Sequence, residues 1–203
     1  MLKGLHKNLR RDERGITGLE TAIILIAFVV VASVFAYTVL SAGIFSSQKG
    51  QEAVYAGLSE ARATMEIKGS MFAKGNGTGN LTVYQASFTL TNAMKGQAID
   101  LTPNDGGNNT HVTIISYTDP NQHVSDLLWS VDWIGKNNGD NLLEQDEQAV
   151  VTVDLATVAD GGLLTTSPGI YDSFTIEVKP VTGASLILNR TLPGRIDPVM
   201  DLH

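Results

Sequence analysis

An uninterrupted apolar run near the N-terminus constrains the fold of this chain more than any other feature. No charged side chain occurs from Thr21 to Gln48, and Ala22–Leu40 is apolar except for Ser33 and Thr38. A helix of ~20 apolar residues spans a bilayer. Because this run is apolar around its whole circumference, it suits lipid or the interior of a helical assembly and not the surface of a soluble domain.

The charge distribution gives this run an orientation. Residues 1–15 carry five basic and two acidic side chains, a net charge of +3, whereas the remainder of the 203-residue chain carries −10. A basic tip before an apolar run is typical of a membrane segment whose basic end stays in the cytoplasm, so we expect at least transient membrane insertion. The acidic remainder argues against nucleic-acid binding, because it cannot neutralise phosphates.

Three kinds of N-terminal segment compete for this pattern: a secretory signal peptide removed after the apolar run, a permanent single-pass anchor, and a pilin-like leader cut before the run. A secretory signal has an apolar region of only ~7–15 residues, followed by a small-residue cleavage site. The apolar run here is longer, and a helix-compatible sequence continues beyond it. The secretory signal therefore fits poorly.

The helical pattern extends well past the apolar run. Val54, Leu58, Ala61 and Met65 recur on one helical stripe. No proline occurs among the first 102 residues. We therefore predict one helix over about residues 17–67, ~75 Å long at 1.5 Å per residue, which is too long to be only a membrane span.

A pilin-like leader has a local signature here. Arg10–Gly15 (RRDERG) stands directly before Ile16, and Glu20 is the only charge at the start of the apolar run. If the chain is cut after Gly15, Glu20 becomes the fifth mature residue. A carboxylate at the edge of an apolar helix is costly to desolvate unless it is paired, and the freed α-amine of Ile16 is the expected partner. We also expect Glu20 in the first helical turn, where the macrodipole favours negative charge.

RRDERG followed by ITGLETAIILIAFVVVASVFAYTVLSAG resembles the class III leader and N-terminal helix of archaellins, the archaeal flagellins. The resemblance covers roughly residues 10–68. It implies cutting between Gly15 and Ile16 by a prepilin-type peptidase, and packing of the mature helix in a filament core. The side chains assigned to assembly are Glu20, Ile23, Ile24, Ile26, Phe28, Val30 and Val34.

The resemblance further implies an extracellular motility filament of identical or sister archaellins, assembled and turned by a membrane motor platform. The alternatives are a subunit of a pilus-like adhesion filament and a membrane-anchored binding module. Glu20 is more usual in type IV pilins than in archaellins. However, the chain lacks the phenylalanine at mature position one and the helix-kinking proline of bacterial pilins.

Beyond a Gly/Asn-rich stretch the hydrophobic period changes to two, which indicates strands. The strand candidates are 81–91, 111–118, 127–134, 148–155, 173–180 and 184–191, with 97–101 as a possible seventh. About seven such strands favour an antiparallel, immunoglobulin-like β-sandwich. We thus predict an α+β chain divided into a leader (1–15), a filament-core helix (16–68), a connector (69–80) and a β-sandwich outer domain (81–203).

Few residues suggest a ligand. Trp129 and Trp133 share a strand face, for which a core position is favoured over a binding platform. Asn138, Asp140 and Glu144 are weak candidates for a structural calcium ion, but their spacing does not fit an EF-hand and a solvated turn is favoured. No GxSxG or HExxH motif occurs, cysteine is absent and the four histidines are scattered, so we expect no enzyme, metal or other cofactor.

Four sequons favour an exported surface. Asn76, Asn80, Asn108 and Asn189 are each followed two residues later by Thr, which makes them candidates for N-glycosylation. N-glycosylation is frequent in archaellins, so the resemblance supports this expectation.

Overall fold

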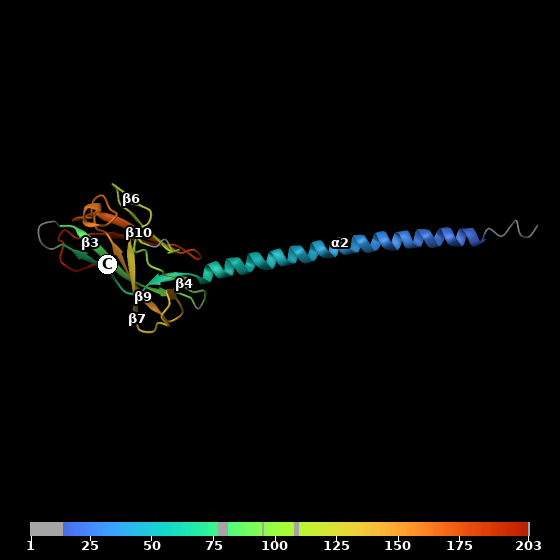
Figure 1. The fold of residues 1–203 in the computed structure, drawn as a ribbon, viewed down its shortest axis with the longest axis horizontal. Helices are drawn as coiled ribbons and strands as arrows, with labels where there is room; N and C mark the ends of the chain where they lie inside the picture. Colours follow the sequence, from blue (N-terminus) through green and yellow to red (C-terminus); the bar gives the residue numbers. More distant parts are fainter. Residues whose placement is uncertain (1–13, 77–80, 95, 108–109, 203) are drawn as a thin grey trace, which may run out of the picture. The chain divides into compact units, whose positions relative to one another are not determined.

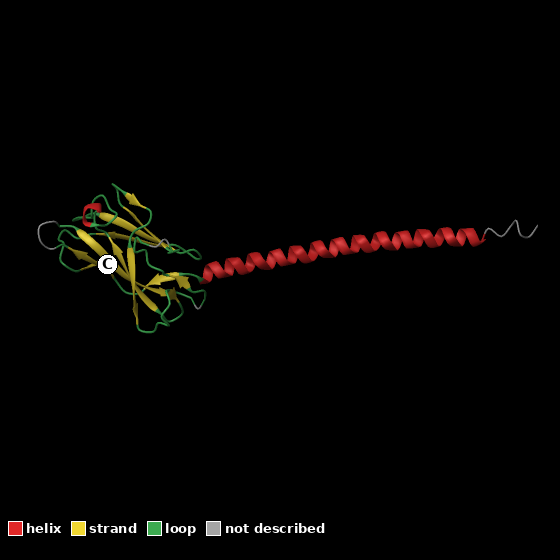
Figure 2. Ribbon diagram, in the orientation of Figure 1, coloured by secondary structure: helices red, strands yellow, loops and turns green. Residues whose placement is uncertain are grey.

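The computed structural model describes residues 14–76, 81–94, 96–107 and 110–202. It has one long apolar helix followed by antiparallel β-sheets, which confirms the predicted fold class (Figures 1 and 2). The chain divides between Val54 and Tyr55 into two compact units.

Helix α2 spans Arg14–Arg62, 49 residues or ~74 Å. The prediction that the helix continues to about residue 67 was wrong. Met65–Ile67 instead forms strand β1, in which Met65 is buried in the β-core and pairs with Asn92. The spacing of Met65 from Val54, Leu58 and Ala61 predicted a helical residue. Burial and strand pairing in the β-domain outweigh this local helix preference.

The β-domain contains eleven strands besides β1 in the described residues. They are β2 (Met71–Gly75), β3 (Val83–Asn92), β4 (Ile99–Asp100), β5 (Ile114–Thr118), β6 (His123–Val124), β7 (Trp129–Ile134), β8 (Leu142–Leu143), β9 (Gln148–Asp154), β10 (Ser173–Lys179), β11 (Leu186–Thr191) and β12 (Met200–Leu202). Each of the seven predicted segments overlaps one of these strands, whereas β1, β2, β6, β8 and β12 were not predicted.

Two sheets account for most of the strands. A six-stranded antiparallel sheet has the order β12-β2-β3-β9-β7, with β1 also paired to β3, and a four-stranded sheet has the order β11-β10-β5-β6. Strands β4 and β8 pair separately. Buried side chains of both large sheets form one hydrophobic cluster, which includes Phe88 and Val151 of the first sheet and Tyr117 and Phe174 of the second. The core therefore lies between the sheets, as in a β-sandwich.

The stretch expected to be a connector contributes to this core. Residues 71–75 form β2, whose Met71 and Ala73 are fully buried and which pairs with both β3 and β12. The glycines and polar residues on either side concealed the alternation of buried and exposed positions in so short a strand. Only residues 76–82 separate β2 from β3.

Trp129 occupies the core position that was predicted for it. Its side chain is 3% exposed, and Trp133 on the same strand packs partly buried against the core. Trp129 therefore does not offer an exposed aromatic platform.

Candidate assembly interface

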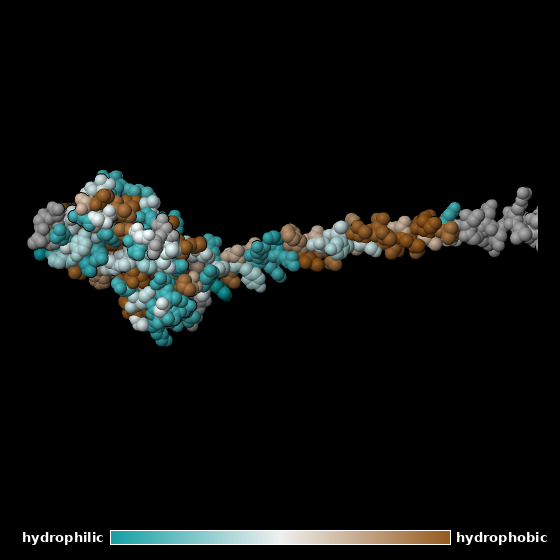
Figure 3. All heavy atoms as spheres, viewed as in Figure 1, coloured by the Kyte–Doolittle hydropathy of each residue, from teal (hydrophilic) through white to brown (hydrophobic). Residues whose placement is uncertain are grey.

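The first part of α2 presents an exposed apolar surface. All six apolar residues predicted to act in assembly are more than half exposed, from Val30 at 55% to Phe28 at 74%. Figure 3 shows this part of the helix as largely hydrophobic, with hydrophilic groups gathering toward the β-domain end. An exposed apolar surface of this extent marks a site of interaction with protein or membrane.

Three hydroxyl groups along this surface form hydrogen bonds within the helix. Thr21 Oγ1 donates to Gly18 O at 3.0 Å, Ser33 Oγ to Val29 O at 2.6 Å and Thr38 Oγ1 to Phe35 O at 2.8 Å. An unpaired hydroxyl is costly to bury, whereas one that bonds to its own helix is not left unsatisfied. The helix can therefore leave water without losing these hydrogen bonds.

The first ion pair past the uncharged segment is local and exposed. Lys49 Nζ lies 2.6 Å from Glu52 Oε2, with both side chains more than half exposed. The helix beyond residue 48 is thus suited to a wetter environment than the apolar run. This change in character occurs inside a single continuous helix.

The predicted cleavage site and Glu20 both lie within α2. Because the helix begins at Arg14, Gly15 and Ile16 are helical in the uncut chain, and Glu20 is exposed beyond the first turn. The expectation that Glu20 lies in the first turn is therefore wrong for the precursor. Its interaction with the helix N-terminus has to arise from a new chain start at Ile16.

Two glycines of the β-domain, Gly96 and Gly183, pack against the C-terminal end of α2. We call residues 62–64 the neck. A Cβ atom at Gly96 would lie 2.5 Å from Arg62 Cβ, and one at Gly183 only 1.6 Å from Ala63 O. Ala93 N also donates to Thr64 O at 2.8 Å. Backbone therefore packs directly against backbone at the neck.

Nothing in the sequence alone singled out these two glycines. Gly96 and Gly183 stand in ordinary turn-like contexts, and their role depends on a contact with residues far away in the chain. Gly183 additionally has φ +108°, a conformation that side-chain-bearing residues rarely adopt.

The loop proposed as a weak calcium site forms hydrogen-bonded turns. Asn138 Oδ1 accepts from Asp140 N at 3.0 Å, and Asp140 Oδ1 accepts from Leu142 N at 2.9 Å. Asn138 Nδ2 donates to Glu144 at 3.3 Å. In the described part of the chain, no three His, Cys, Asp or Glu side chains gather in a way that could hold a metal ion. The geometry supports a solvated turn.

Two of the four sequon asparagines fall within the described residues. Asn76 is exposed just after β2. Asn189 is exposed on the edge strand β11, but its Nδ2 donates to Thr175 Oγ1 at 3.1 Å and its sequon partner Thr191 bonds to Ser173. Asn80 and Asn108 lie outside the described residues. Of the two described asparagines, only Asn189 lies within a strand.

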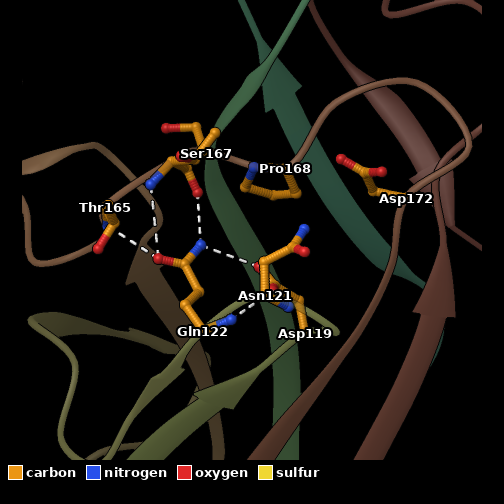
Figure 4. Close-up of a pocket in the computed structure, with 8 residues that line it drawn as sticks. Asp119, Asn121, Gln122, Thr165, Ser167, Pro168 and Asp172 are labelled. Atoms are coloured by element: carbon orange, nitrogen blue, oxygen red, sulfur yellow. Dashed lines mark hydrogen bonds between the residues drawn. The ribbon is translucent and has the colours of Figure 1, made fainter.

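A pocket on the β-domain is lined by side chains of a polar network (Figure 4). Gln122 Nε2 donates to Asp119 Oδ2 at 2.9 Å and to Thr166 O at 2.6 Å, while Gln122 Oε1 accepts from Thr165 N at 2.8 Å. Tyr117 Oη donates to Asp119 Oδ2 at 2.9 Å. This network ties the turn after β5 to the loop that contains residues 165–166.

The ionisation of Asp119 and Tyr117 fits a structural role for the network. Burial alone would raise the pKa of Asp119, but hydrogen bonds from Gln122, Asn121 and Tyr117 outweigh it and hold the pKa below its ordinary value. Burial, followed by the Asp119 carboxylate, raises the pKa of Tyr117. The carboxylate stays charged and the phenol neutral near neutral pH, which favours a fixed hydrogen bond over proton transfer.

Comparisons with known proteins agree with this architecture. The family model for archaeal-type flagellin matches residues 15–190. The chain is 41% identical to probable flagellin 1 of Archaeoglobus fulgidus over 95% of this chain and 96% of that protein. It is 35% identical to probable flagellin 2 of the same organism over 92% and 93% of the two chains.

A solved filament is also similar. The archaeal flagellum of Methanospirillum hungatei strain JF1 matches with a TM-score of 0.67 and 28% sequence identity, and the match covers 91% of this chain and 98% of that one. The sequence similarity and the structural similarity thus extend over both the helix and most of the β-domain. The chain belongs to the archaeal-type flagellin family.

Proposed function

We propose that this chain is the structural subunit of an archaeal flagellum filament, in which α2 packs against the helices of neighbouring copies and the β-domains form the wet exterior. The exposed apolar surface of α2 carries this proposal. Burial of ~20 apolar side chains contributes ~1.5–3 kcal/mol each. This driving force is far larger than that of a polar surface contact, so the helix is the polymerising element.

The subunit is made as a precursor. Its leader, residues 1–15, is removed by a prepilin-type peptidase while the apolar helix lies in the membrane, and the cut falls between Gly15 and Ile16. The five basic side chains of the leader hold it on the cytoplasmic side. Their removal is required, because charges at the start of the helix cannot be buried in an apolar core without a large cost.

The mature subunit passes from the membrane to an extracellular filament on a membrane motor and assembly platform. Its partners in the filament are identical or sister flagellins. The family is one of structural filament proteins, which fits a role as a mechanical element in swimming. N-glycosylation is proposed first at Asn76, because that side chain is exposed outside a strand.

Glu20 is proposed to pair with the new α-amine of Ile16 in the filament core. We expect Glu20→Gln to reduce filament yield at least tenfold and to leave the β-domain folded, because an amine left unpaired in an apolar core costs roughly 3–5 kcal/mol. Glu52→Gln is the matched control, since Glu52 lies in the same helix but its only described partner is an exposed lysine. Filaments sheared from cells of each strain are counted by electron microscopy and identified by mass spectrometry.

The two arms of this experiment answer different questions. Wild-type filaments that do not contain this chain would overturn the proposed function. A normal yield from Glu20→Gln would overturn only the ion pair, and a loss as large in Glu52→Gln would show that any missing carboxylate has the same effect.

A further inference from the structure

The end of the β-domain next to the neck carries exposed apolar side chains. We call the surface formed by Tyr55, Leu58, Val112, Ile114 and Val181 the foot. Each of these side chains is exposed, from 41% for Ile114 to 72% for Val181. All five belong to the same compact unit, which begins at Tyr55.

Two hollows that share one lining residue bring most of the foot together. Tyr55 and Leu58, on the last turns of α2, line one hollow together with Gln97. Gln97 also lines a second hollow, together with Val112 and Val181. Ser59 donates a short hydrogen bond to the Gln97 side chain, which holds the two hollows together. The two hollows therefore adjoin at the polar side chain of Gln97, with apolar side chains of the foot on both sides of it.

Backbone contacts hold the foot against the helix end. Ile114 pairs with Lys179 across β5 and β10, next to the turn that carries Val181. The same turn contains Gly183, which packs against Ala63 O in the neck. Val112, Ile114 and Val181 are therefore held beside Tyr55 and Leu58 by a main-chain contact at the neck as well as by side chains.

The packing distances of helices determine what can lie against the foot. Helices in a bundle pack with their axes 8–10 Å apart. A surface that lies beside one helix is therefore close to the position of the next helix in the bundle. In a filament whose helices bundle at this spacing, an exposed apolar surface beside one helix is within reach of α2 of an adjacent copy.

We propose that the foot is a docking surface for α2 of a neighbouring copy, a contact that rests on the proposed filament function. The contact joins two different surfaces, the foot of one copy and the helix of the next. Such a heterologous contact propagates into an open helical polymer when it does not close into a ring. The outer domain thereby fixes the position of the neighbouring helix as well as covering the core.

The absence of cysteine from the chain allows a clean cross-linking test. Val181→Cys is combined with one cysteine at each position from 44 to 51 of α2 in turn, and assembled filaments are oxidised. We expect at least one combination to give a ladder of dimers, trimers and higher species on a denaturing gel. A disulfide within one copy would not produce a ladder.

Val199→Cys, combined with the same helix positions, is the matched control. Val199 is also an exposed valine, at 62%, but it follows Pro198, whose carbonyl bonds to Gly75 at the end of the domain away from the neck. We expect no ladder from these control variants. Val112→Cys serves as a second foot position if Val181→Cys lowers the amount of folded subunit.

The outcomes separate this contact from the filament function itself. Normal filaments in which neither foot cysteine gives a ladder at any helix position would overturn the docking surface and leave the filament function intact. Ladders of equal strength from Val199→Cys would also overturn it. Failure of the cysteine-free parent to form filaments would instead contradict the proposed function.

Discussion

Gly15→Val is expected to abolish filaments. A peptidase that cuts after residue 15 meets a branched side chain where the natural chain has only hydrogen, so the precursor should stay uncut. The uncut subunit keeps the five basic side chains of residues 1–15. Burying even one unpaired charge costs several kcal/mol, enough to reduce assembly by well over 100-fold.

The measurement is the intact mass of the membrane-bound subunit together with a filament count. Wild-type subunits from sheared filaments should begin at Ile16, whereas Gly15→Val should retain Met1 or Leu2 and give no filaments. Gly50→Val makes the same chemical change far along the same helix and should be cut normally. Filaments built from uncut Gly15→Val subunits would contradict the role given to the leader.

Gly183→Ala should destabilise the β-domain strongly. The φ of +108° is unfavourable for alanine, and the added methyl group would lie 1.6 Å from Ala63 O, so the neck has to shift. The backbone penalty of about 1–2 kcal/mol and an overpacking penalty of about 1–3 kcal/mol together predict a loss of about 2–5 kcal/mol. For a domain of this size the melting temperature should fall by roughly 5–15 °C.

Gly139→Ala is the matched control, because it adds a methyl group at a positive φ without the steric contact that Gly183→Ala makes with Ala63. Gly139 has φ +95°, and no atom lies within 4 Å of the position its Cβ would take. This variant should lose only the backbone term. Both tryptophans lie on β7, so tryptophan fluorescence during heating of the detergent-solubilised subunit reports the β-domain and not the helix. Equal melting temperatures for the two variants would rule out a tight neck.

The sequence predicted those parts of the fold that depend on local pattern. The run from Ala22 to Leu40 predicts a helix that needs a partner, because its composition alone excludes a soluble surface. The long strands β3, β9 and β10 were found for the same reason, since two-residue alternation over seven to ten residues leaves little ambiguity.

The missed features depend on contacts between distant residues. Strand β1 has three residues, and only its pairing with β3 distinguishes it from the helical stripe that precedes it. Gly96 and Gly183 matter because of Arg62 and Ala63, which are far away in sequence. Gln122 is an ordinary polar residue until the fold places it against residues 165–166. A single sequence carries no signal for such pairs.

Because α2 ends at Arg62, a fragment without the helix has to begin earlier than the predicted helix end suggests. A fragment that starts near Gly69, after the predicted helix end, would lose β1 together with the buried side chains of Ala63 and Met65. A fragment that starts at Ala63 keeps every strand and all of the described core. At about 140 residues this fragment is large enough for an independent core without disulfides.

The association state of this fragment tests the division of labour between helix and domain most directly. Circular dichroism and size-exclusion chromatography of the chain from Ala63 onward should give a β-rich spectrum and a soluble monomer at concentrations where the mature subunit forms filaments. The fragment keeps Val112, Ile114 and Val181 of the foot but lacks Tyr55, Leu58 and the helix on which the foot docks. Filaments or ordered polymers of the fragment would contradict the claim that α2 drives assembly.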